Sequence, residues 1–587
     1  MRIIKSFSII IEFLLPKYKV KIPKSILHFG LLLLVAILFS SKVTAQSNFI
    51  TLGDKQYNFI ERMDIKLVND SVLRFTTTKP YNRNRVTLRI EYIDSLYKSG
   101  STTLSLSKTD KYNMQDMLQN NADVTAKNQL IPQHKMVLGL FAMDQHAYFA
   151  RTNNYTLVVD PVLNLEGGYS TSINEPRFFN TRGMMIRGMV DKKISFWAYL
   201  SDNQERDPQY VIDYTNNHNS TVSGQGFTKV NASHAYDYFN SRAGISFNMG
   251  KYFDLVFAYD KLSVGNGYRS LFLSDNSSSY PYLRFVTHFG RINYEATIAQ
   301  TYSLYTNNVR FLHTPAPVNY LAIHHISMQL TKRLNIGLYE NSMEKGSDGF
   351  KIGYLNPVIF YKAIEQDYGT AGKTNIGIDF KENAFKNFQF YGQLLFNEFH
   401  FKDILHYSQG AFTNKQALQL GVKYIDAFAI KDFDLQFETN LIRPYTYMNY
   451  DSTTNFTNYN QPLAHPLGAN CREFIFIAKF QPSPRLNLTG KLFYYEQGLD
   501  LKGLNYGSNL LETYNTRPGN YGFFIGSGQL AKCLLTSLNV AYELKSNLFL
   551  EANISNRGYK LEGASDSNER TYMLGFRWNI ARRDFEF

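Results

Sequence analysis

Apolar and polar side chains alternate along most of the chain beyond residue 160. In 387–397 (NFQFYGQLLFN), phenylalanine and leucine occupy one face of an extended segment, and glutamine, tyrosine and asparagine occupy the other. The same pattern recurs in 434–441 (DLQFETNL) and 547–555 (NLFLEANIS). Segments of about ten residues with one apolar and one polar face are typical of transmembrane barrel strands, whose apolar face contacts lipid. A soluble sandwich gives the same alternation, usually in shorter strands.

The connections between these segments separate the two alternatives. Short turns, such as 290–291 and 332–333, alternate with long loops, such as 262–281 and 443–471. Outer-membrane barrels have this layout, with short turns in the periplasm and long loops outside the cell. The pattern predicts an all-β fold, a transmembrane antiparallel β-barrel of about 18 strands over 159–587. The expected strands begin near residues 161, 181, 192, 241, 252, 282, 291, 322, 333, 375, 387, 415, 432, 472, 485, 533, 546 and 570.

The last predicted strand has an apolar row, and the chain ends at Phe587. A C-terminal aromatic strand ending in phenylalanine resembles the assembly signal of outer-membrane barrels. The charged stretch 582–584 departs from the usual terminal alternation. The row consists of Tyr572, Leu574, Phe576, Trp578 and Ile580.

The N-terminus has the pattern of a secretory signal. Lysines between 17 and 24 precede an apolar stretch from Ile26 to Phe39, and Val43-Thr44-Ala45 provides a cleavage site. We therefore expect residues 1–45 to be a signal peptide, with a retained anchor as the alternative. No cysteine follows the site, which argues against a lipoprotein. Removal of 1–45, with seven Lys/Arg and one Glu, lowers the net formal charge from +13 to +7.

Residues 46–158 lack the barrel pattern. Tyr57–Leu67 and Ser71–Thr78 have strand-like patterns, whereas Arg85–Tyr97 and Lys108–Leu118 have helix-like ones. We expect a small α+β segment in the periplasm before the first barrel strand. The alternative is a segment that folds up into the lumen as a plug.

The stretch 260–275 (DKLSVGNGYRSLFLSD) resembles a glycine-rich phosphate loop at first sight. A phosphate loop needs glycines between a buried strand and a helix N-terminus, and this stretch lies in an antiparallel hairpin without a third glycine or G-K-[ST]. We therefore expect a tight loop with positive φ at Gly265 and Gly267. Arg269 would pair with Asp260 or Asp275, and the loop would fold into the barrel mouth.

This stretch also carries a family resemblance. The run FAYDKLSVGNGYRSLFLSDNSSSYPYLRF, together with 354–370, 388–399, 420–438 and 443–470, is similar to Wzi-type capsule-assembly outer-membrane proteins. It is most similar to members like the gliding-motility protein RemB. The resemblance covers most of 160–587 and implies a monomeric barrel of about 18 strands, plugged by its own loops. It also implies a role in surface polysaccharide attachment or in surface motility.

A second plug element is expected at 354–368. Asn356 is a good helix N-cap, Pro357 suits the first helical position, and Glu365 adds charge behind an apolar stripe. Such a helix must bury its apolar face, in the barrel mouth or over neighbouring loops. The predicted plug and signature-loop residues are Asp260, Lys261, Gly265, Gly267, Tyr268, Arg269, Ser270, Ser274, Asp275, Asn356, Pro357 and Glu365.

The loop 443–470 combines tyrosines with asparagine, aspartate and glutamine. Sugars are commonly held by an aromatic ring against a C–H face and by hydrogen bonds to such polar groups, so the loop is a candidate glycan contact. The alternative is an interfacial girdle of aromatic side chains. The candidate residues are Arg443, Tyr445, Tyr447, Tyr450, Tyr459 and Gln461.

Catalytic and cofactor motifs are missing from the sequence. His324, His325 and His465 accompany no H-E-x-x-H, G-x-S-x-G or spaced cysteine cluster, so we expect no enzyme, cofactor or metal. Cys471 and Cys533 could pair or remain free thiols. The leading hypothesis is an outer-membrane protein for capsular polysaccharide or gliding, with lipid, surface polysaccharide and export or gliding machinery as partners and no nucleic acid. A porin or specific channel is the alternative.

Overall fold

The fold was determined as a computed structural model. It describes residues 48–126, 143, 145–191, 193–226, 228–230, 235–250, 252–303, 317–356, 360–369, 374–398 and 407–587. The predicted signal peptide lies outside the described residues. Within these ranges, no helix is both long enough and apolar enough to cross a membrane.

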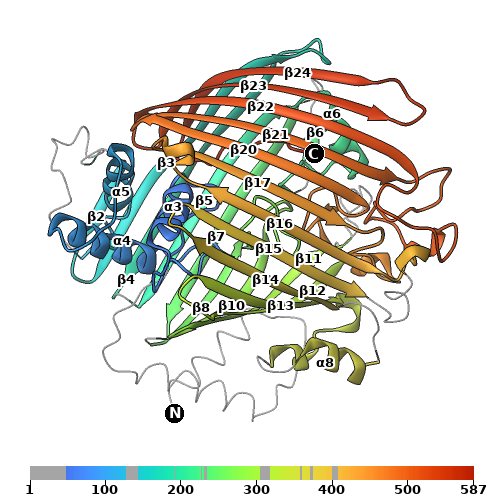
Figure 1. The fold of residues 1–587 in the computed structure, drawn as a ribbon, viewed down its shortest axis with the longest axis horizontal. Coiled ribbons are helices and arrows are strands. Elements are labelled where there is room, and N and C mark those ends of the chain that lie inside the picture. Colours follow the sequence, from blue (N-terminus) through green and yellow to red (C-terminus); the bar gives the residue numbers. More distant parts are fainter. Residues whose placement is uncertain are drawn as a thin grey trace, which may run out of the picture.

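The described chain forms a closed antiparallel barrel whose 18 wall strands follow one another in sequence order (Figure 1). The last strand pairs with the first, from Trp578 opposite Leu163 to Thr571 opposite Ser170. The predicted fold class and strand number are confirmed. The wall strands are β3 (Tyr155–Ser170), β4 (Arg177–Val190), β5 (Ile194–Arg206), β7 (Tyr236–Asn248), β8 (Phe253–Asp260), β10 (Tyr280–Phe289), β11 (Ile292–Tyr302), β12 (Val318–Gln329), β13 (Leu334–Lys345), β14 (Thr374–Ala384), β15 (Phe388–Glu398), β16 (Lys415–Tyr424), β17 (Phe433–Ile442), β20 (Cys471–Ser483), β21 (Leu486–Leu499), β22 (Gln529–Lys545), β23 (Leu548–Leu561) and β24 (Ser567–Trp578).

Alternation along each strand separates a lipid-facing surface from a polar lumen. On β17, Phe437 is 45% exposed on the outer face, whereas its neighbour Glu438 is fully buried inside. Successive side chains of a strand point to opposite faces, so each strand contributes an apolar row outside and a polar row inside. The inner row is buried because polypeptide fills much of the lumen.

The two ends of the barrel differ. At one end, here called the short-turn end, strands are joined by tight turns such as Gly290-Arg291 and Ser546-Asn547. Gly290 (φ 59°) and Asn547 (φ 61°) take the left-handed conformation that tight hairpins require. The other end, the long-loop end, carries most of the long connections. In outer-membrane barrels the short turns face the periplasm.

In its described residues, the N-terminal segment is mainly helical, with α3 (Gln56–Leu67), α4 (Arg83–Lys98) and α5 (Lys108–Asn120). It also has two short strands, β1 (Thr78–Lys79) and β2 (Tyr148–Arg151), and β2 pairs with the first wall strand. The predicted strand over 57–67 is therefore wrong. Phe59, Ile60 and Met63 are buried at helical spacing, and this periodicity outweighs the strand-like composition.

This segment closes the short-turn end and enters the lumen (Figure 1). Phe49 packs against Trp197 of β5, with ring centroids 5.5 Å apart. Strand β1 pairs with β9 (Ser263–Val264), which belongs to the loop that follows β8. The contacts match the alternative in which the segment contributes to the plug.

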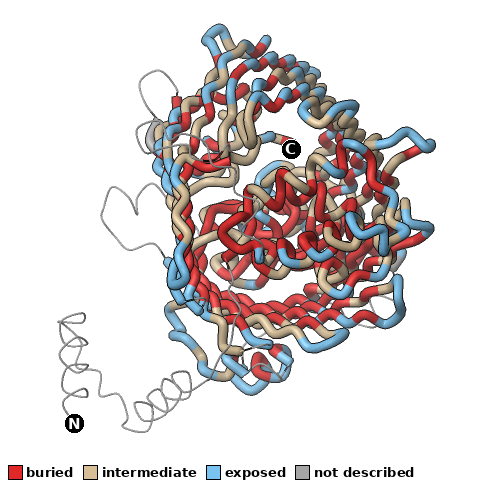
Figure 2. Tube along the Cα trace, turned by 90° about the vertical axis from the view of Figure 1, so that its left-hand side faces the viewer, coloured by how far each residue is buried: buried red, intermediate tan, exposed pale blue. Residues whose placement is uncertain are grey.

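Chain from further regions occupies the lumen. It includes the loop 261–279 (the inner loop), the loop 443–470, part of the loop 207–235, and a tail at 579–587 that follows β24. In Figure 2 the strands form a ring, buried chain fills one side of its interior, and the C-terminus lies inside the ring. The apolar row that the sequence predicts for the last strand is correct from Tyr572 to Trp578. It does not extend to Ile580, because β24 ends at Trp578.

Candidate functional site

The inner loop holds a carboxylate of the wall. The backbone N–H groups of Tyr268 and Arg269 donate to the two carboxylate oxygens of Glu438, at 2.6 and 3.0 Å. A Cβ added to Gly267 would lie 2.5 Å from the same carboxylate, so glycine permits this close approach. The predicted positive φ is present at Gly265 (156°) but not at Gly267. The backbone of the glycine-rich stretch therefore binds a carboxyl group that belongs to the barrel itself.

Arg269 fixes the loop to the next strand of the wall, β20, which pairs with β17. Its guanidinium forms two bonds to Glu473 of β20, Nη2–Oε1 at 3.0 Å and Nε–Oε2 at 3.3 Å, and it also donates to the main-chain oxygen of Glu586 in the tail. The expected pairing with Asp260 or Asp275 is wrong. Asp260 accepts from Trp197 at 3.3 Å, and the side chain of Asp275 is exposed.

The remaining signature residues hold the inner loop to its neighbours. Lys261 donates to the carbonyls of Gly224 and Asp275 at 2.6 and 3.0 Å, and burial lowers the pKa of Lys261 to about 8. Ser270 bonds Val264 within the loop, and the Ser274 amide donates to Leu463 at 2.8 Å. These bonds connect three long loops into one plug.

The loop 443–470 supports this plug from the long-loop end. Four of its six candidate glycan contacts are therefore buried in the plug. Tyr445 and Tyr447 are buried, and their hydroxyls donate to Asn505 (2.8 Å) and Leu271 (2.9 Å). Arg443 and Gln461 are also buried. Buried side chains offer no ring face or hydrogen bond to a sugar that arrives from outside, so these four do not form a surface site.

An exposed aromatic surface lies on the neighbouring loops. Tyr450 is 71% exposed and packs edge-on to Tyr514, while Tyr521 is 59% exposed. Arg517 donates to Asn520 at 2.8 Å. We call these five residues the outer aromatic patch. Of these five residues, the sequence analysis identified only Tyr450. The other four lie in the stretch YNTRPGNYG at 514–522, whose proline and glycines indicate a surface turn carrying two tyrosines.

Tyr459 is half-buried, with its ring 4.7 Å from Tyr302 on β11. It therefore belongs to the packing between a loop and the wall. Its position does not connect it with the outer aromatic patch.

The predicted plug helix at 354–368 is placed differently. A 3-10 turn, η3 (Ile352–Leu355), precedes α8 (Tyr361–Asp367), and Pro357 lies outside the described residues. Asn356 ends η3, and α8 starts later than expected, with Phe360 as its N-cap. The segment lies on the outside of the wall over β13 and β14 (Figure 1), where Glu365 accepts from Thr374 at 2.7 Å. It is therefore not plug material.

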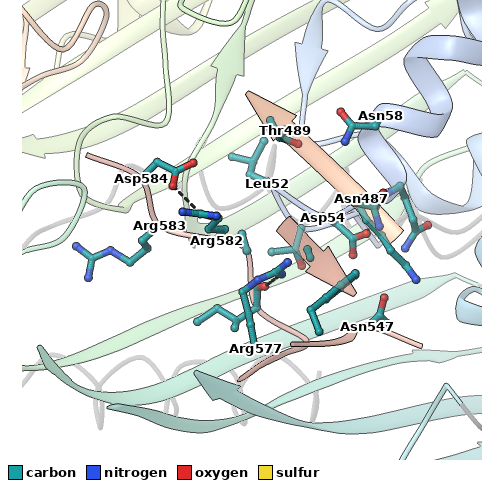
Figure 3. Close-up of a pocket in the computed structure, with 18 of the residues that line it drawn as sticks. Leu52, Asp54, Asn58, Asn487, Thr489, Asn547, Arg577, Arg582, Arg583 and Asp584 are labelled. Atoms are coloured by element: carbon teal, nitrogen blue, oxygen red, sulfur yellow. Dashed lines mark hydrogen bonds and ion pairs between the residues drawn. The ribbon is translucent and has the colours of Figure 1, made fainter. Parts of the chain in front are cut away.

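A polar cavity of about 650 Å³ remains beside the plug (Figure 3). Several of its charged groups are paired within the protein: Arg582 contacts Asp584 at 2.7 Å, and Arg577 contacts Glu551 at 3.1 Å. Because opposite charges neutralise one another along the lining, the cavity does not select strongly for one sign of charge. Further lining residues are Leu52, Asp54, Asn58, Asn487, Thr489, Asn547 and Arg583.

The histidines of the described chain have structural partners. His325 Nε2 lies 2.8 Å from Asp379, and His465 Nε2 lies 2.7 Å from Glu473. The ring of His324 packs against that of Tyr361 of α8. Within the described ranges, no three His, Cys, Asp or Glu side chains are grouped as metal ligands.

Comparisons with known proteins identify the architecture. No family model and no curated protein matches the chain. The outer-membrane protein Wzi of Escherichia coli, involved in group 1 capsule assembly and described as a carbohydrate-binding β-barrel, matches with a TM-score of 0.52 at 11% identity, covering 91% of this chain and 100% of Wzi. OprD of Pseudomonas aeruginosa (TM-score 0.40, 11% identity) and its OpdK (0.41, 7%) each cover 72% of this chain, and 94% and 98% of their own lengths. The chain is a β-barrel of the outer membrane with a Wzi-like fold.

Proposed function

We propose that this chain is a non-enzymatic outer-membrane protein that attaches or assembles polysaccharide at the cell surface. The observation that carries the proposal is the division between a filled lumen and an exposed aromatic patch outside. The inner loop is bonded to Glu438 and Glu473 on two wall strands, so it serves to close the lumen and not to bind a ligand there. The outer loops are left to contact ligands.

The outer aromatic patch has the composition of a sugar-binding surface. Tyr450 and Tyr521 present rings to solvent, and Arg517, which lies over the ring of Tyr514, and its partner Asn520 add hydrogen-bonding groups on the same loop as Tyr521. Tyrosine combines an apolar face with a polar hydroxyl, which suits the mixed surface of a sugar. Wzi, which has the same fold, is described as carbohydrate-binding, and this supports the same ligand class here.

A binding assay with isolated surface polysaccharide tests the proposal. The triple variant Tyr450→Ala, Tyr514→Ala, Tyr521→Ala should lose most of the affinity, because the rings that cover the sugar are removed. A matched control replaces tyrosine outside the patch, Tyr155→Ala, which is 47% exposed at the short-turn end. Wild-type affinity in the triple variant would remove this patch as the site.

The cavity beside the plug favours one second function, a narrow transport channel. Its lining runs from Asn547 at the short-turn end to Gln225 and Asn276 on the long loops. Single-channel recording in planar bilayers distinguishes the two functions. Large steady currents from the purified wild-type protein would replace the attachment role with transport.

The sequence resemblance to RemB-like members supports a role of the same loops in gliding motility. Deletion of the gene separates the two surface roles. Loss of capsule with normal spreading supports the polysaccharide role, whereas loss of spreading with normal capsule supports motility.

A further inference from the structure

The outer face of β13 carries acidic residues where lipid-facing strands carry apolar ones. Glu340 and Glu344 lie on the same, outward face of β13 as Leu338, yet they are only 5% and 3% exposed. A charged side chain on the lipid face of a barrel is destabilising in the apolar band. Their burial therefore requires a cover on the outside of the wall.

The cover consists of residues 350–356 and 360–368, here called the outer clasp. Tyr354 donates its hydroxyl to Glu344 at 2.8 Å, and Lys351 Nζ lies 3.0 Å from the same carboxylate. The backbone amide of Lys362 donates to Glu340 at 3.1 Å. Through these bonds, the inner side of the clasp satisfies the outward carboxylates. The ring of Tyr361 also packs against that of His324, with ring centroids 4.1 Å apart.

The side of the clasp that faces away from the barrel exposes large apolar residues. Ile352 is 70% exposed, Leu355 50% and Phe360 68%. Lys362 and Asp367 are exposed on α8, so the free surface combines apolar and charged parts. In water this arrangement would be unfavourable, because polar groups are covered while apolar groups are solvated. In contact with lipid the same arrangement is favourable.

The clasp is also continuous with the lipid-facing wall. Leu338, Ile376 and Ile378 on β13 and β14 are 50%, 40% and 46% exposed just below it, towards the short-turn end. The clasp lies outside these strands, beside the long-loop end (Figure 1). We propose that the outer clasp is a membrane anchor whose residues Ile352, Leu355 and Phe360 insert among the acyl chains of the outer leaflet. Lys362 and Asp367 then lie at the headgroups, as in other interfacial helices.

Spin-label accessibility in the full-length protein tests this anchor. The variants Phe360→Cys and Leu355→Cys carry the label, and the native cysteines are buried. Leu338→Cys serves as the lipid reference and Tyr521→Cys as the water reference. In phosphatidylethanolamine–phosphatidylglycerol vesicles, the ratio of oxygen to nickel-chelate accessibility at 360 and 355 should equal that at 338 and exceed that at 521 several-fold.

Two results would overturn the anchor. A ratio at 360 and 355 equal to that at 521 would show that the clasp lies in water. Protection from both reagents, together with a dimer in crosslinking, would show that a second copy covers the clasp instead of lipid. Labelling at two positions guards against a local effect of one substitution. The test is independent of polysaccharide binding, because it uses no glycan.

Discussion

Arg269 of the inner loop and Glu473 of β20 form a bidentate ion pair inside the barrel, with N–O distances of 3.0 and 3.3 Å. Glu473 is fully buried and is also bonded by His465. Loss of one partner of a buried pair leaves a charge without compensation and costs ~3–5 kcal/mol. The pair therefore holds the inner loop against the wall.

We expect Arg269→Ala to release the inner loop while the barrel itself stays folded, because the wall is held by backbone hydrogen bonds. Limited proteolysis in detergent should then cut within 261–279. The control is Arg472→Ala on the same strand, which removes a pair with Glu496 whose arginine is 52% exposed. Such exposed pairs contribute about 0–1 kcal/mol. An inner loop as resistant in Arg269→Ala as in the control would contradict the role of the pair.

Substitution by alanine should destabilise the loop 443–470 strongly at Tyr445 and hardly at Tyr450. Tyr445 is fully buried and packs 5.0 Å from the ring of Phe523, so Tyr445→Ala should cost about 3–5 kcal/mol in the stability of the loop, as for other buried aromatic residues. Tyr450 is 71% exposed, and Tyr450→Ala should stay within about 0.5 kcal/mol. Hydrogen exchange of the amides in 443–470 measures both effects. Equal protection in the two variants would be inconsistent with this difference.

Acid should loosen the N-terminal segment at Glu61. Burial alone would raise the pKa of Glu61, but Lys423, Lys79 and Lys479 lower it from 4.5 to about 2. A carboxylate whose pKa is depressed in the folded state contributes stability above its unfolded pKa and loses it as pH falls through the folded pKa. The contribution of Glu61 is therefore complete above pH 4.5 and disappears between pH 4.5 and 2.

Trp197 provides the readout for this transition, because it packs against Phe49 of the same segment. The chain has two tryptophans, so the variant Trp578→Phe leaves Trp197 as the single reporter. Its fluorescence should change between pH 4.5 and 2. Glu61→Gln should weaken docking at neutral pH and reduce the change in the acid range. The prediction fails if both proteins titrate identically.

Cys471 and Cys533 should remain thiols. Cys471 pairs with Gln497 of β21, and Cys533 pairs with Tyr495 of the same strand on its other side. Two strand spacings and an offset of two residues along β21 separate the cysteines by about 11–12 Å, and a disulfide needs Cα atoms within about 7 Å. Both are free and buried. Alkylation should therefore fail in the native protein and reach two thiols after denaturation, without reduction.

The wall was predictable from the sequence because alternation reports which face of a strand meets lipid, one residue at a time. The faces of β17 and β24 follow directly from that rule. The plug was less predictable because its contacts are long-range. Nothing near Arg269 in the sequence indicates Glu473 as its partner. The clasp was misplaced for a related reason: an apolar helix stripe shows that a face is buried, but not on which side of the wall.

The tail 579–587 follows the last wall strand and turns into the lumen. Lys491 of β21 lies 2.6 Å from Asp584 and 2.7 Å from Glu586, and Phe587 packs 4.4 Å from Tyr214. Trp578 ends β24, so the aromatic residues at the end of the wall are Phe576 and Trp578. The tail therefore closes the lumen beside the plug, and its Phe587 is not part of the lipid-facing row.

Deletion of residues 582–587 should open the lumen without preventing barrel assembly. The deletion removes the groups that fill the space next to the cavity and leaves Lys491 without Asp584 and Glu586. Steady conductance in planar bilayers should exceed that of the wild-type protein, while the heat-dependent shift in gel mobility should remain. Trp578→Ala is the control variant, because it alters the last wall strand and keeps the tail. Should the deletion block assembly while Trp578→Ala assembles normally, the tail 582–587 is required for assembly and does more than close the lumen.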